Sequence, residues 1–436
     1  MPDDVRIPND LDSFWMPFTP SRAFQDAPRL IHKAEGVRYV TIDGAEKFDG
    51  TGGLWCSNAG HNHPRIVEAI QRQAAELDFA HNFGQGHPIA FEAAARVVDL
   101  APGMDHVFFT NSGSEAVDTA LKIALAYHAA RGDGGRRMLV GREKAYHGIN
   151  FGGLSVGGIG LNKGQFGTLY SSTAHLRHTW LEENHFSRGM PEHGAHLAED
   201  LQRLCDLHGG HTIAAVIVEP VSGAGGVFPP PLGYLERLRE ICDANGILLI
   251  FDEVITGFGR MGTPFAYEAF GVQPDLVTCA KGMTNATVPM GGVLATSAVR
   301  EAFRQAPSKM PDLFHGYTYS GHPLASAACI ATLDVYRDED IFGNAARMAA
   351  PWEEMLHGLA DIDAVVDVRN CGIIGAVQLR QDGAVGDAGR AAHAALWDAG
   401  LIVRPIGDAL AMSPPLTITQ DHVDEVGATL RSVLAG

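Results

Sequence analysis

From residue 106 to residue 295 the chain alternates between short apolar runs and helix-forming segments, such as the alanine-rich stretch 114–130 and residues 233–245. Short apolar runs separated by helical patterns are typical of buried strands joined by helical crossovers. Strands connected in this way lie parallel, and a parallel sheet needs helices on both of its faces. We therefore expect an α/β domain with a mostly parallel sheet. The expected strands are residues 107–109, 138–140, 213–218, 247–251, 276–279 and 292–295.

The segments that flank this alternation predict a second, smaller lobe, because 436 residues exceed the size at which one hydrophobic core keeps growing. We divide the chain into an N-terminal segment of the small lobe (1–64), a large domain (65–322) and a C-terminal small domain (323–436). Around these boundaries we expect a hairpin formed by 37–42 and the run to residue 48, helices at 64–77, 194–207, 324–337 and 420–434, strands at 365–369, 373–379 and 401–403, and loops at 148–167 and 185–193.

Composition excludes several classes of protein. With 46% hydrophobic and 19% charged residues the chain can bury a large core, and a net charge of −18 argues against binding to nucleic acid. No apolar stretch is long enough to span a bilayer, and the acidic N-terminus lacks the pattern of a signal peptide. The six cysteines are scattered without a C-x-x-C pair, which favours reduced thiols. We expect a cytoplasmic protein that acts on small molecules.

Lys281 is the residue with the most informative setting. It directly follows the apolar run 274–280, and Asp252 directly follows the run 247–251. Burial disfavours the ammonium form of a lysine and so leaves a nucleophilic amine. Pyridoxal phosphate needs such a lysine on its aldehyde and a buried aspartate on its ring nitrogen. The alternative is that both residues only mark strand ends, although an apolar strand seldom ends in an unpaired charge.

The other lysines offer no comparable setting. Lys122 falls inside the expected helix 114–130 and Lys144 in a polar turn, and of the seven lysines only Lys281 directly ends an apolar strand. The twenty histidines suggest a metal site at first, with His61, His63 and His147 as candidates. No H-E-x-x-H or similar ligand spacing occurs, so we expect no metal.

Residues 110–116, Thr-Asn-Ser-Gly-Ser-Glu-Ala, join a strand to the start of a helix. Small residues there allow backbone amides to approach a phosphate, and the hydroxyls of Ser112 and Ser114 on either side of Gly113 could donate to it. The alternative is an ordinary serine N-cap with a glutamate in the first turn. Competing phosphate motifs fail, because 157–160 lacks the spacing of a dinucleotide fingerprint and no Gly-Lys-Ser/Thr sequence exists.

Further residues could contact the two faces of the ring. If 252–254 continues a strand, Asp252 and Val254 point the same way, so that Val254 could pack on one face of the ring. Tyr146, which is followed by His147, comes after the strand 138–140 and could stack on the opposite face. Glu219 ends the strand 213–218, where it either supports the site or is an exposed residue at a strand end.

These segments together resemble the class III (ω-) aminotransferases of fold type I along nearly the whole chain. Residues 251–260 are similar to the cofactor-strand signature of that family and 280–282 to its lysine segment. Within the class, the similarity is closest to β-alanine–pyruvate (ω-amino acid–pyruvate) aminotransferases. It is carried by residues 15–18 (Trp-Met-Pro-Phe), 53–56 (Gly-Leu-Trp-Cys), 111–122 and 315–323. The resemblance implies a large domain with a mostly parallel seven-stranded sheet, and a smaller α/β domain built from both ends of the chain.

The resemblance also implies roles for individual residues. Ser112, Gly113 and Ser114 would bind the phosphate, Tyr146 and Val254 the ring, and Asp252 its nitrogen; His147 and Glu219 count as further cofactor-binding residues. Thr318 would reach the phosphate of a neighbouring subunit, which implies a homodimer, or a dimer of dimers, with shared active sites. Phe18, Trp55, Phe83 and Tyr146 would line the substrate pocket, and Arg404 would bind the carboxylate of the acceptor, since a guanidinium binds carboxylates bidentately.

The implied reaction transfers an amino group from an ω-amino acid or another amine to pyruvate. β-Alanine, taurine and simple amines stay open as donors. A mutase, racemase or decarboxylase with the same cofactor, and a non-enzymatic regulator, are alternatives; a regulator would carry a basic helix-turn-helix segment, which the acidic N-terminus does not offer. One departure from the subgroup is Ala286-Thr287, where Gly-Ala is usual, and it predicts a shifted substrate range.

Overall fold

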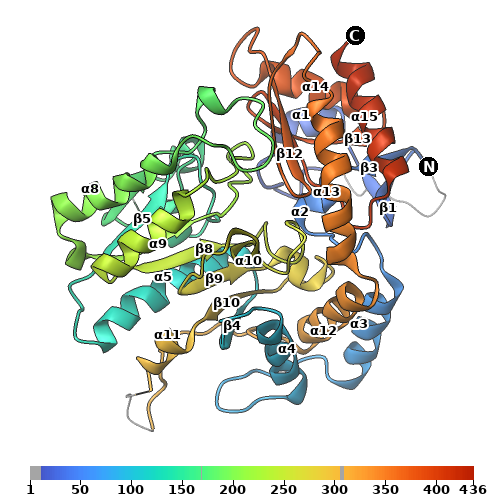
Figure 1. Ribbon diagram of the computed structural model, residues 1–436. Helices are drawn as coiled ribbons and strands as arrows, with labels where there is room; N and C mark the ends of the chain where they lie inside the picture. Colours follow the sequence, from blue (N-terminus) through green and yellow to red (C-terminus); the bar gives the residue numbers. More distant parts are fainter. Residues whose placement is uncertain (1–10, 168, 305–308) are drawn as a thin grey trace.

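The computed structural model describes residues 11–167, 169–304 and 309–436 (Figure 1). A seven-stranded sheet forms the large domain, in the order β4-β10-β9-β8-β7-β5-β6. Its strands are β4 (His106–Thr110), β5 (Met138–Arg142), β6 (Thr173–Leu176), β7 (Ile213–Val218), β8 (Leu248–Asp252), β9 (Leu276–Cys279) and β10 (Gly291–Ala295). Only β10 runs antiparallel to its neighbours. The predicted mostly parallel sheet is confirmed.

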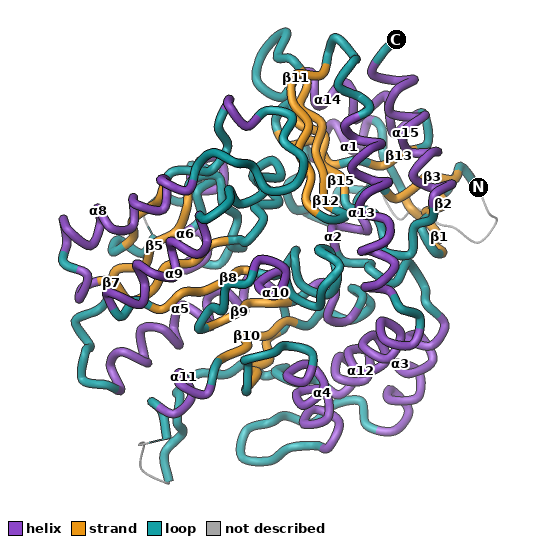
Figure 2. Tube along the Cα trace, viewed as in Figure 1, coloured by secondary structure: helices purple, strands orange, loops and turns teal. Residues whose placement is uncertain are grey.

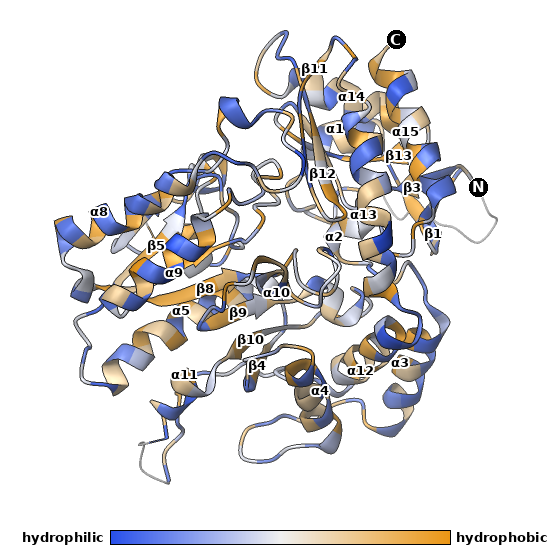
Figure 3. Cartoon of the chain, in the orientation of Figure 1, coloured by the Kyte–Doolittle hydropathy of each residue, from blue (hydrophilic) through white to orange (hydrophobic). Residues whose placement is uncertain are grey.

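Helices cover both faces of this sheet, as alternation along β7 shows. Ala215 and Ile217 share one core with residues of α5 (Gly113–Ala130), whereas Val216 and Val218 share another with residues of α9 (Tyr234–Asn245). Successive strand residues point to opposite faces, so a run that is apolar throughout requires cover on both. The central strands are accordingly hydrophobic along their length (Figure 3).

The two ends of the chain build the smaller part of the fold together. Strand β13 (Leu401–Ile402) pairs in parallel with β3 (Glu46–Asp49), and so joins the N-terminal sheet of β1 (Ile31–Glu35) and β2 (Arg38–Thr41). The expected hairpin is β2 with β3. A third sheet has the order β11-β12-β15-β14 and stands apart from the large sheet in Figure 2. Its strands are β11 (Val365–Cys371), β12 (Ile374–Leu379), β14 (Arg404–Ile406) and β15 (Ala409–Met412).

Most of the expected helices are present. They are α3 (Pro64–Glu76), α8 (Glu199–His208), α12 (Pro323–Asp338) and α15 (Gln420–Leu434). Helix α12 packs against α3 and against α4 (Pro88–Asp99). The proposed domain limits at residues 64 and 322 stay a prediction. The remaining helices are α1 (Ser21–Asp26), α2 (Gly52–Trp55), α6 (Phe151–Val156), α7 (Gly160–Lys163), α10 (Ala266–Phe270), α11 (Ser297–Glu301), α13 (Ile341–His357) and α14 (Asp387–Asp398).

Two expectations about local structure are wrong. The predicted loop 148–167 contains the short helices α6 and α7, which glycine-rich sequence conceals because glycine has a low helix propensity. Strand β8 ends at Asp252, so Val254 lies in a turn and not on the strand. None of the described helices is long and apolar enough to cross a membrane. The acidic segment 1–5 lies outside the described residues.

Candidate active site

A cavity of about 180 Å³ opens where the large sheet presents the carboxyl ends of its parallel strands. Strands β4, β5, β7, β8 and β9 all run in one direction, so the segments that follow them meet at one edge. Ligands bind at this edge in open α/β sheets. The cavity is lined by Leu54, Ser112, Gly113, Ser114, Val117, Tyr146, His147, Gly148, Glu219, Asp252, Val254, Ile255 and Lys281.

Lys281 lines this cavity and follows the end of β9 after one intervening residue, Ala280. Its backbone has a φ of 45°, in the left-handed region that a lysine seldom adopts. Burial lowers the pKa of Lys281 from 10.5 to about 8, because desolvation penalises the ammonium form. The Trp55 ring centroid lies 5.6 Å from Lys281 Nζ. The amine is therefore far easier to deprotonate than that of a lysine in water.

Asp252 is held in place at the end of β8 by neighbours on both of its oxygens. His147 Nδ1 lies 2.7 Å from Asp252 Oδ2, and Thr278 Oγ1 donates to Asp252 Oδ1 at 3.0 Å. Thr278 is the direct cross-strand partner of Asp252 on β9. His147 and Asp252 are both buried. Because each contact limits rotation of the carboxyl group, the side chain is fixed before any ligand binds.

Glu219 is buried and supports the loop that carries Tyr146. Its Oε1 accepts a hydrogen bond from the Tyr146 amide at 2.9 Å, and its Oε2 accepts one from the Gly223 amide at 2.8 Å. Burial raises the pKa of the Glu219 carboxyl. The alternative of an exposed glutamate at a strand end is wrong. Tyr146 is half-buried, and desolvation raises the pKa of its phenol.

The segment 111–116 begins α5 at the cavity. Ser112 is the N-cap and accepts a hydrogen bond from the Glu115 amide at 3.2 Å, as in an ordinary cap. The amides of Gly113 and Ser114 belong to the first turn and so have no intrahelical acceptor. A Cβ atom on Gly113 would lie 2.8 Å from Val254 Cγ1, so only glycine allows this close approach. Val254 reaches the cavity from its turn, although the strand periodicity predicted for it does not hold.

The remaining predicted residues do not line this cavity. Trp55 is 2% exposed and lies beside Lys281. Phe18 and Phe83 are 74% and 55% exposed, and Thr318 is exposed in the segment before α12. Arg404 begins β14, where its backbone pairs with Ala411 of β15, and its side chain makes no hydrogen bond or ion pair with the residues that the structure describes. Burial of the guanidinium lowers the pKa of Arg404, and its charge interaction with Tyr146 acts in the opposite direction.

Sequence reasoning missed Thr278, Leu54, Val117 and Ile255. Thr278 lies within an expected strand, and only its pairing with Asp252 distinguishes it from other buried threonines. Leu54 sits next to Trp55 and comes from the N-terminal segment, far from the other residues in sequence. Among residues 11–167, 169–304 and 309–436, no group of three histidine, cysteine, aspartate or glutamate side chains is arranged to hold a metal ion.

Comparison with known proteins identifies the family to which the chain belongs. The chain matches the family model "Aminotransferase class-III" over residues 21–434, and it belongs to the class III aminotransferases. It is 54% identical over 429 residues to an omega-aminotransferase of Caulobacter vibrioides, covering 98% of each chain. It is 44% identical over 432 residues to the beta-alanine–pyruvate aminotransferase of Pseudomonas aeruginosa, covering 98% of this chain and 96% of that one.

The fold is likewise shared with a solved amine transaminase from an uncultivated Pseudomonas species in its PLP-bound form. The two chains superpose with a TM-score of 0.90 at 38% identity, covering 97% of this chain and 98% of the other. The predicted family and the predicted fold type are thus confirmed.

Proposed function

We propose that the protein is a pyridoxal phosphate-dependent aminotransferase that moves an amino group from an ω-amino acid or a related amine to pyruvate. The proposal rests mainly on one observation, which is that three features line the same cavity. These are the Lys281 amine with its lowered pKa, the buried Asp252 carboxyl group and the amino end of α5. The names of the two relatives above, one of them a beta-alanine–pyruvate aminotransferase, support the same reaction.

The residues of the cavity fit pyridoxal phosphate in several independent respects. The free amides at the start of α5, with Ser112 and Ser114, suit a phosphate. Asp252 suits a protonated ring nitrogen, while Tyr146 and Val254, which line the cavity, would supply surfaces for the two faces of the ring. His147 Nε2 is buried and has no partner among the described residues, so its hydrogen-bonding capacity is still available in this site.

When bound, pyridoxal phosphate supplies an electron sink for the negative charge that develops on the donor carbon. Lys281 would hold the cofactor through its amine, and the same amine would move a proton from the amine-bearing carbon of the donor. Burial lowers the pKa of the Lys281 amine in the cofactor-free chain, which favours its use as a base. Asp252 would keep the ring nitrogen protonated, and His147 and Thr278 fix the orientation of the Asp252 carboxyl group.

Arg404 is the proposed binding group for the carboxylate of pyruvate. Its guanidinium has no hydrogen-bond or ion-pair partner among the described residues and interacts electrostatically with Tyr146 of the cavity. A guanidinium in this state can bind a carboxylate with two parallel hydrogen bonds. Trp55, Phe18 and Phe83 are the proposed apolar surfaces for the donor, Trp55 beside Lys281 and the two phenylalanines on the exposed surface.

The proposed active unit is a homodimer, or a dimer of dimers, in which Thr318 reaches the cofactor phosphate of the neighbouring subunit. The exposure of Thr318 and its absence from the cavity of its own chain support this. So do the exposed aromatic residues nearby in sequence, Phe314 and Tyr319, which are 76% and 56% exposed. All six cysteines have free thiols, which supports the proposed cytoplasmic location.

A panel of amine donors tests the function directly. The purified protein, loaded with pyridoxal phosphate, is incubated with pyruvate and with β-alanine, taurine or 1-phenylethylamine, and the alanine formed is measured. Alanine production from at least one donor is the expected result. Release of carbon dioxide, or rearrangement of the donor without alanine, would instead identify a decarboxylase or a mutase.

A further inference from the structure

The turn 51–55 brings Leu54 to the cavity and Trp55 beside Lys281, and its backbone is in an unfavourable conformation. Gly52 and Gly53 have φ values of 55° and 71°, which glycine tolerates, but Trp55 has a φ of 63°. A left-handed backbone is costly for a bulky residue and persists only when surrounding contacts impose it. The contacts that hold this turn therefore decide where the Trp55 ring lies.

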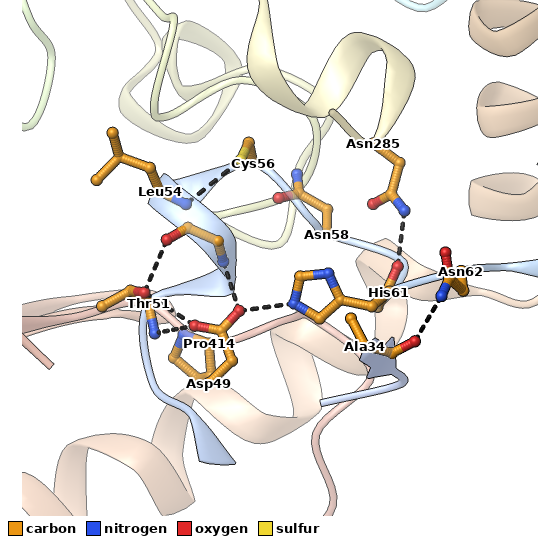
Figure 4. A network of polar contacts seen from close by, with 12 residues as sticks. Ala34, Asp49, Thr51, Leu54, Cys56, Asn58, His61, Asn62, Asn285 and Pro414 are labelled. Atoms are coloured by element: carbon orange, nitrogen blue, oxygen red, sulfur yellow. Dashed lines mark hydrogen bonds and ion pairs between the residues drawn. The ribbon is translucent and has the colours of Figure 1, made fainter. Parts of the chain in front are cut away.

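Asp49 supplies those contacts from inside the turn. Its side chain is fully buried, and its oxygens accept hydrogen bonds from Thr51 N at 3.0 Å, from Thr51 Oγ1 at 2.8 Å and from the Gly53 amide. His61 Nε2 lies 2.8 Å from the same carboxyl group. Figure 4 shows these groups converging on Asp49. Loss of the carboxyl group would leave buried donors without partners, so the turn depends on it.

The same segment is fixed to the loop that carries Lys281. Asn285 accepts a hydrogen bond from the Ala59 amide at 2.8 Å and donates one to the Gly60 carbonyl at 2.7 Å; Figure 4 draws the second of these two bonds. The Ala286 amide in turn donates to the Lys281 carbonyl at 3.2 Å. A Cβ atom on Gly223 would lie only 2.7 Å from Trp55 Cζ3, so the indole packs closely against Gly223. The position of the ring is therefore restricted by Gly223 as well as by the turn.

We propose that Asp49 is a positioning residue that fixes the turn 51–55 and, through Trp55, selects the donors that reach Lys281. The selectivity rests on the proposed function, whereas the hold on the turn does not. Asp49 does not line the cavity and makes no hydrogen bond with Lys281, so we expect its effect on donors to pass through the turn that it holds. Donors of different bulk meet the Trp55 ring beside the reacting amine, and a displaced ring changes their relative access.

Labelling of Cys56 tests the hold on the turn without any reference to activity. Cys56 is partly exposed whereas the other five cysteines are buried, and its Sγ accepts a hydrogen bond from the Leu54 amide at 3.3 Å. In the cofactor-loaded protein, Asp49→Ala is expected to react with a maleimide about tenfold faster than the wild type, because the turn opens. Asp49→Asn retains the size of the side chain, and its labelling rate is expected to lie between those of the wild type and Asp49→Ala. This second variant keeps the test valid if Asp49→Ala does not fold.

The matched control is Asp408→Ala. Asp408 is also buried and accepts hydrogen bonds from two backbone amides, those of Gly386 and Gly389, but it holds a different loop. It is expected to leave the labelling rate of Cys56 unchanged. A wild-type rate in both Asp49 variants, or an equal increase in Asp408→Ala, would overturn the proposal.

Donor selectivity is the second measurement. The ratio of kcat/KM for β-alanine to that for 1-phenylethylamine is expected to change about tenfold in Asp49→Ala, mainly through KM. In a Trp55→Ala background, Asp49→Ala is expected to change the ratio no further, because its effect passes through that ring. If Asp49→Ala changed the ratio equally in the wild-type and Trp55→Ala backgrounds, its effect would not pass through Trp55. Faster labelling in a protein that uses neither donor would contradict the proposed function and leave the role of Asp49 in the turn intact.

Discussion

His147 Nδ1 and Asp252 Oδ2 lie 2.7 Å apart, and both side chains are buried. The contact joins the loop after β5 to the end of β8, two strands that are separated in the sheet by β7. With Thr278 on the other oxygen, it directs the carboxyl group of Asp252 without help from a ligand. This preorganisation is what the proposed contact to a ring nitrogen requires, since a mobile carboxylate would lose conformational entropy on binding.

Asp252→Asn is expected to retain the fold and the cofactor but to lower turnover by about two orders of magnitude or more, because an amide does not keep the ring nitrogen protonated. Steady-state rates with pyruvate and the best donor measure the loss. Asp200→Asn serves as a control, since Asp200 is also buried but pairs with Arg177 away from the cavity. Near-native turnover in Asp252→Asn would show that another group holds the nitrogen.

Lys281 is expected to carry the cofactor covalently. The loaded protein should be yellow, and borohydride should fix the cofactor on the peptide that contains Lys281. Lys281→Ala should be colourless, with turnover reduced by about 10²–10⁴-fold, because the proton-transfer group is lost. Lys144→Met is the matched control and should be labelled like the wild type. Label on the peptide that contains Lys144 or Lys122 would refute the assignment.

The lowered pKa of Lys281 also predicts how the cofactor-free protein responds to pH. Between pH 8 and 10.5 the unfolded chain holds a proton on this amine that the folded chain has lost, so stability rises with pH in that window. Below pH 8 both states are protonated and the full cost of the buried ammonium remains. Lys281→Met should therefore be more stable than the wild type at pH 7, by at most about 3 kcal/mol, with the difference closing by pH 10.5. Urea unfolding at the two pH values measures it, and a constant difference would contradict the predicted pKa.

Arg404→Ala is expected to raise KM for pyruvate about tenfold or more, because a charge-assisted bidentate contact contributes roughly 1.5–3 kcal/mol. KM for 1-phenylethylamine, which has no carboxylate, should change little. Arg390→Ala, which removes an exposed guanidinium paired with Asp387, should affect neither substrate. Equal losses for both substrates would point to a folding defect, and no loss would make Arg404 a simple surface residue.

Gly113→Ala is expected to weaken cofactor binding about tenfold. The new Cβ would lie 2.8 Å from Val254 Cγ1, and displacing that branched side chain from α5 distorts both the phosphate end and the ring face of the cavity. Gly135→Ala is the control, because its Cβ would meet no atom within 4 Å. Equilibrium titration with pyridoxal phosphate measures the affinity of each variant. Equal affinities of Gly113→Ala and the wild type would show that the close approach of Gly113 to Val254 is unimportant.

The amino-acid sequence by itself determined those elements whose buried residues follow a regular pattern within one segment of the chain. Strands β7 and β9 and helix α15 have the predicted bounds. A continuous apolar run indicates a strand that is buried on both faces, and an apolar residue at every third or fourth position indicates a helix that is buried on one face. Lys281 and Asp252 were evident for the same reason, since a charge directly after a buried run is conspicuous. The glycine-rich segment 148–167 carries no such pattern, and its two short helices could not be predicted.

Only the tertiary structure decided which distant residues meet. Thr278 contacts Asp252 because β9 pairs with β8 in one particular register, and Asp49 holds the turn of Trp55 beside Lys281 although more than two hundred residues separate Trp55 from that lysine. Local periodicity records whether a side chain is buried but not what it is buried against. That choice depends on the packing of the two lobes and the order of the strands, where the free energy comes from contacts between segments that no local pattern links.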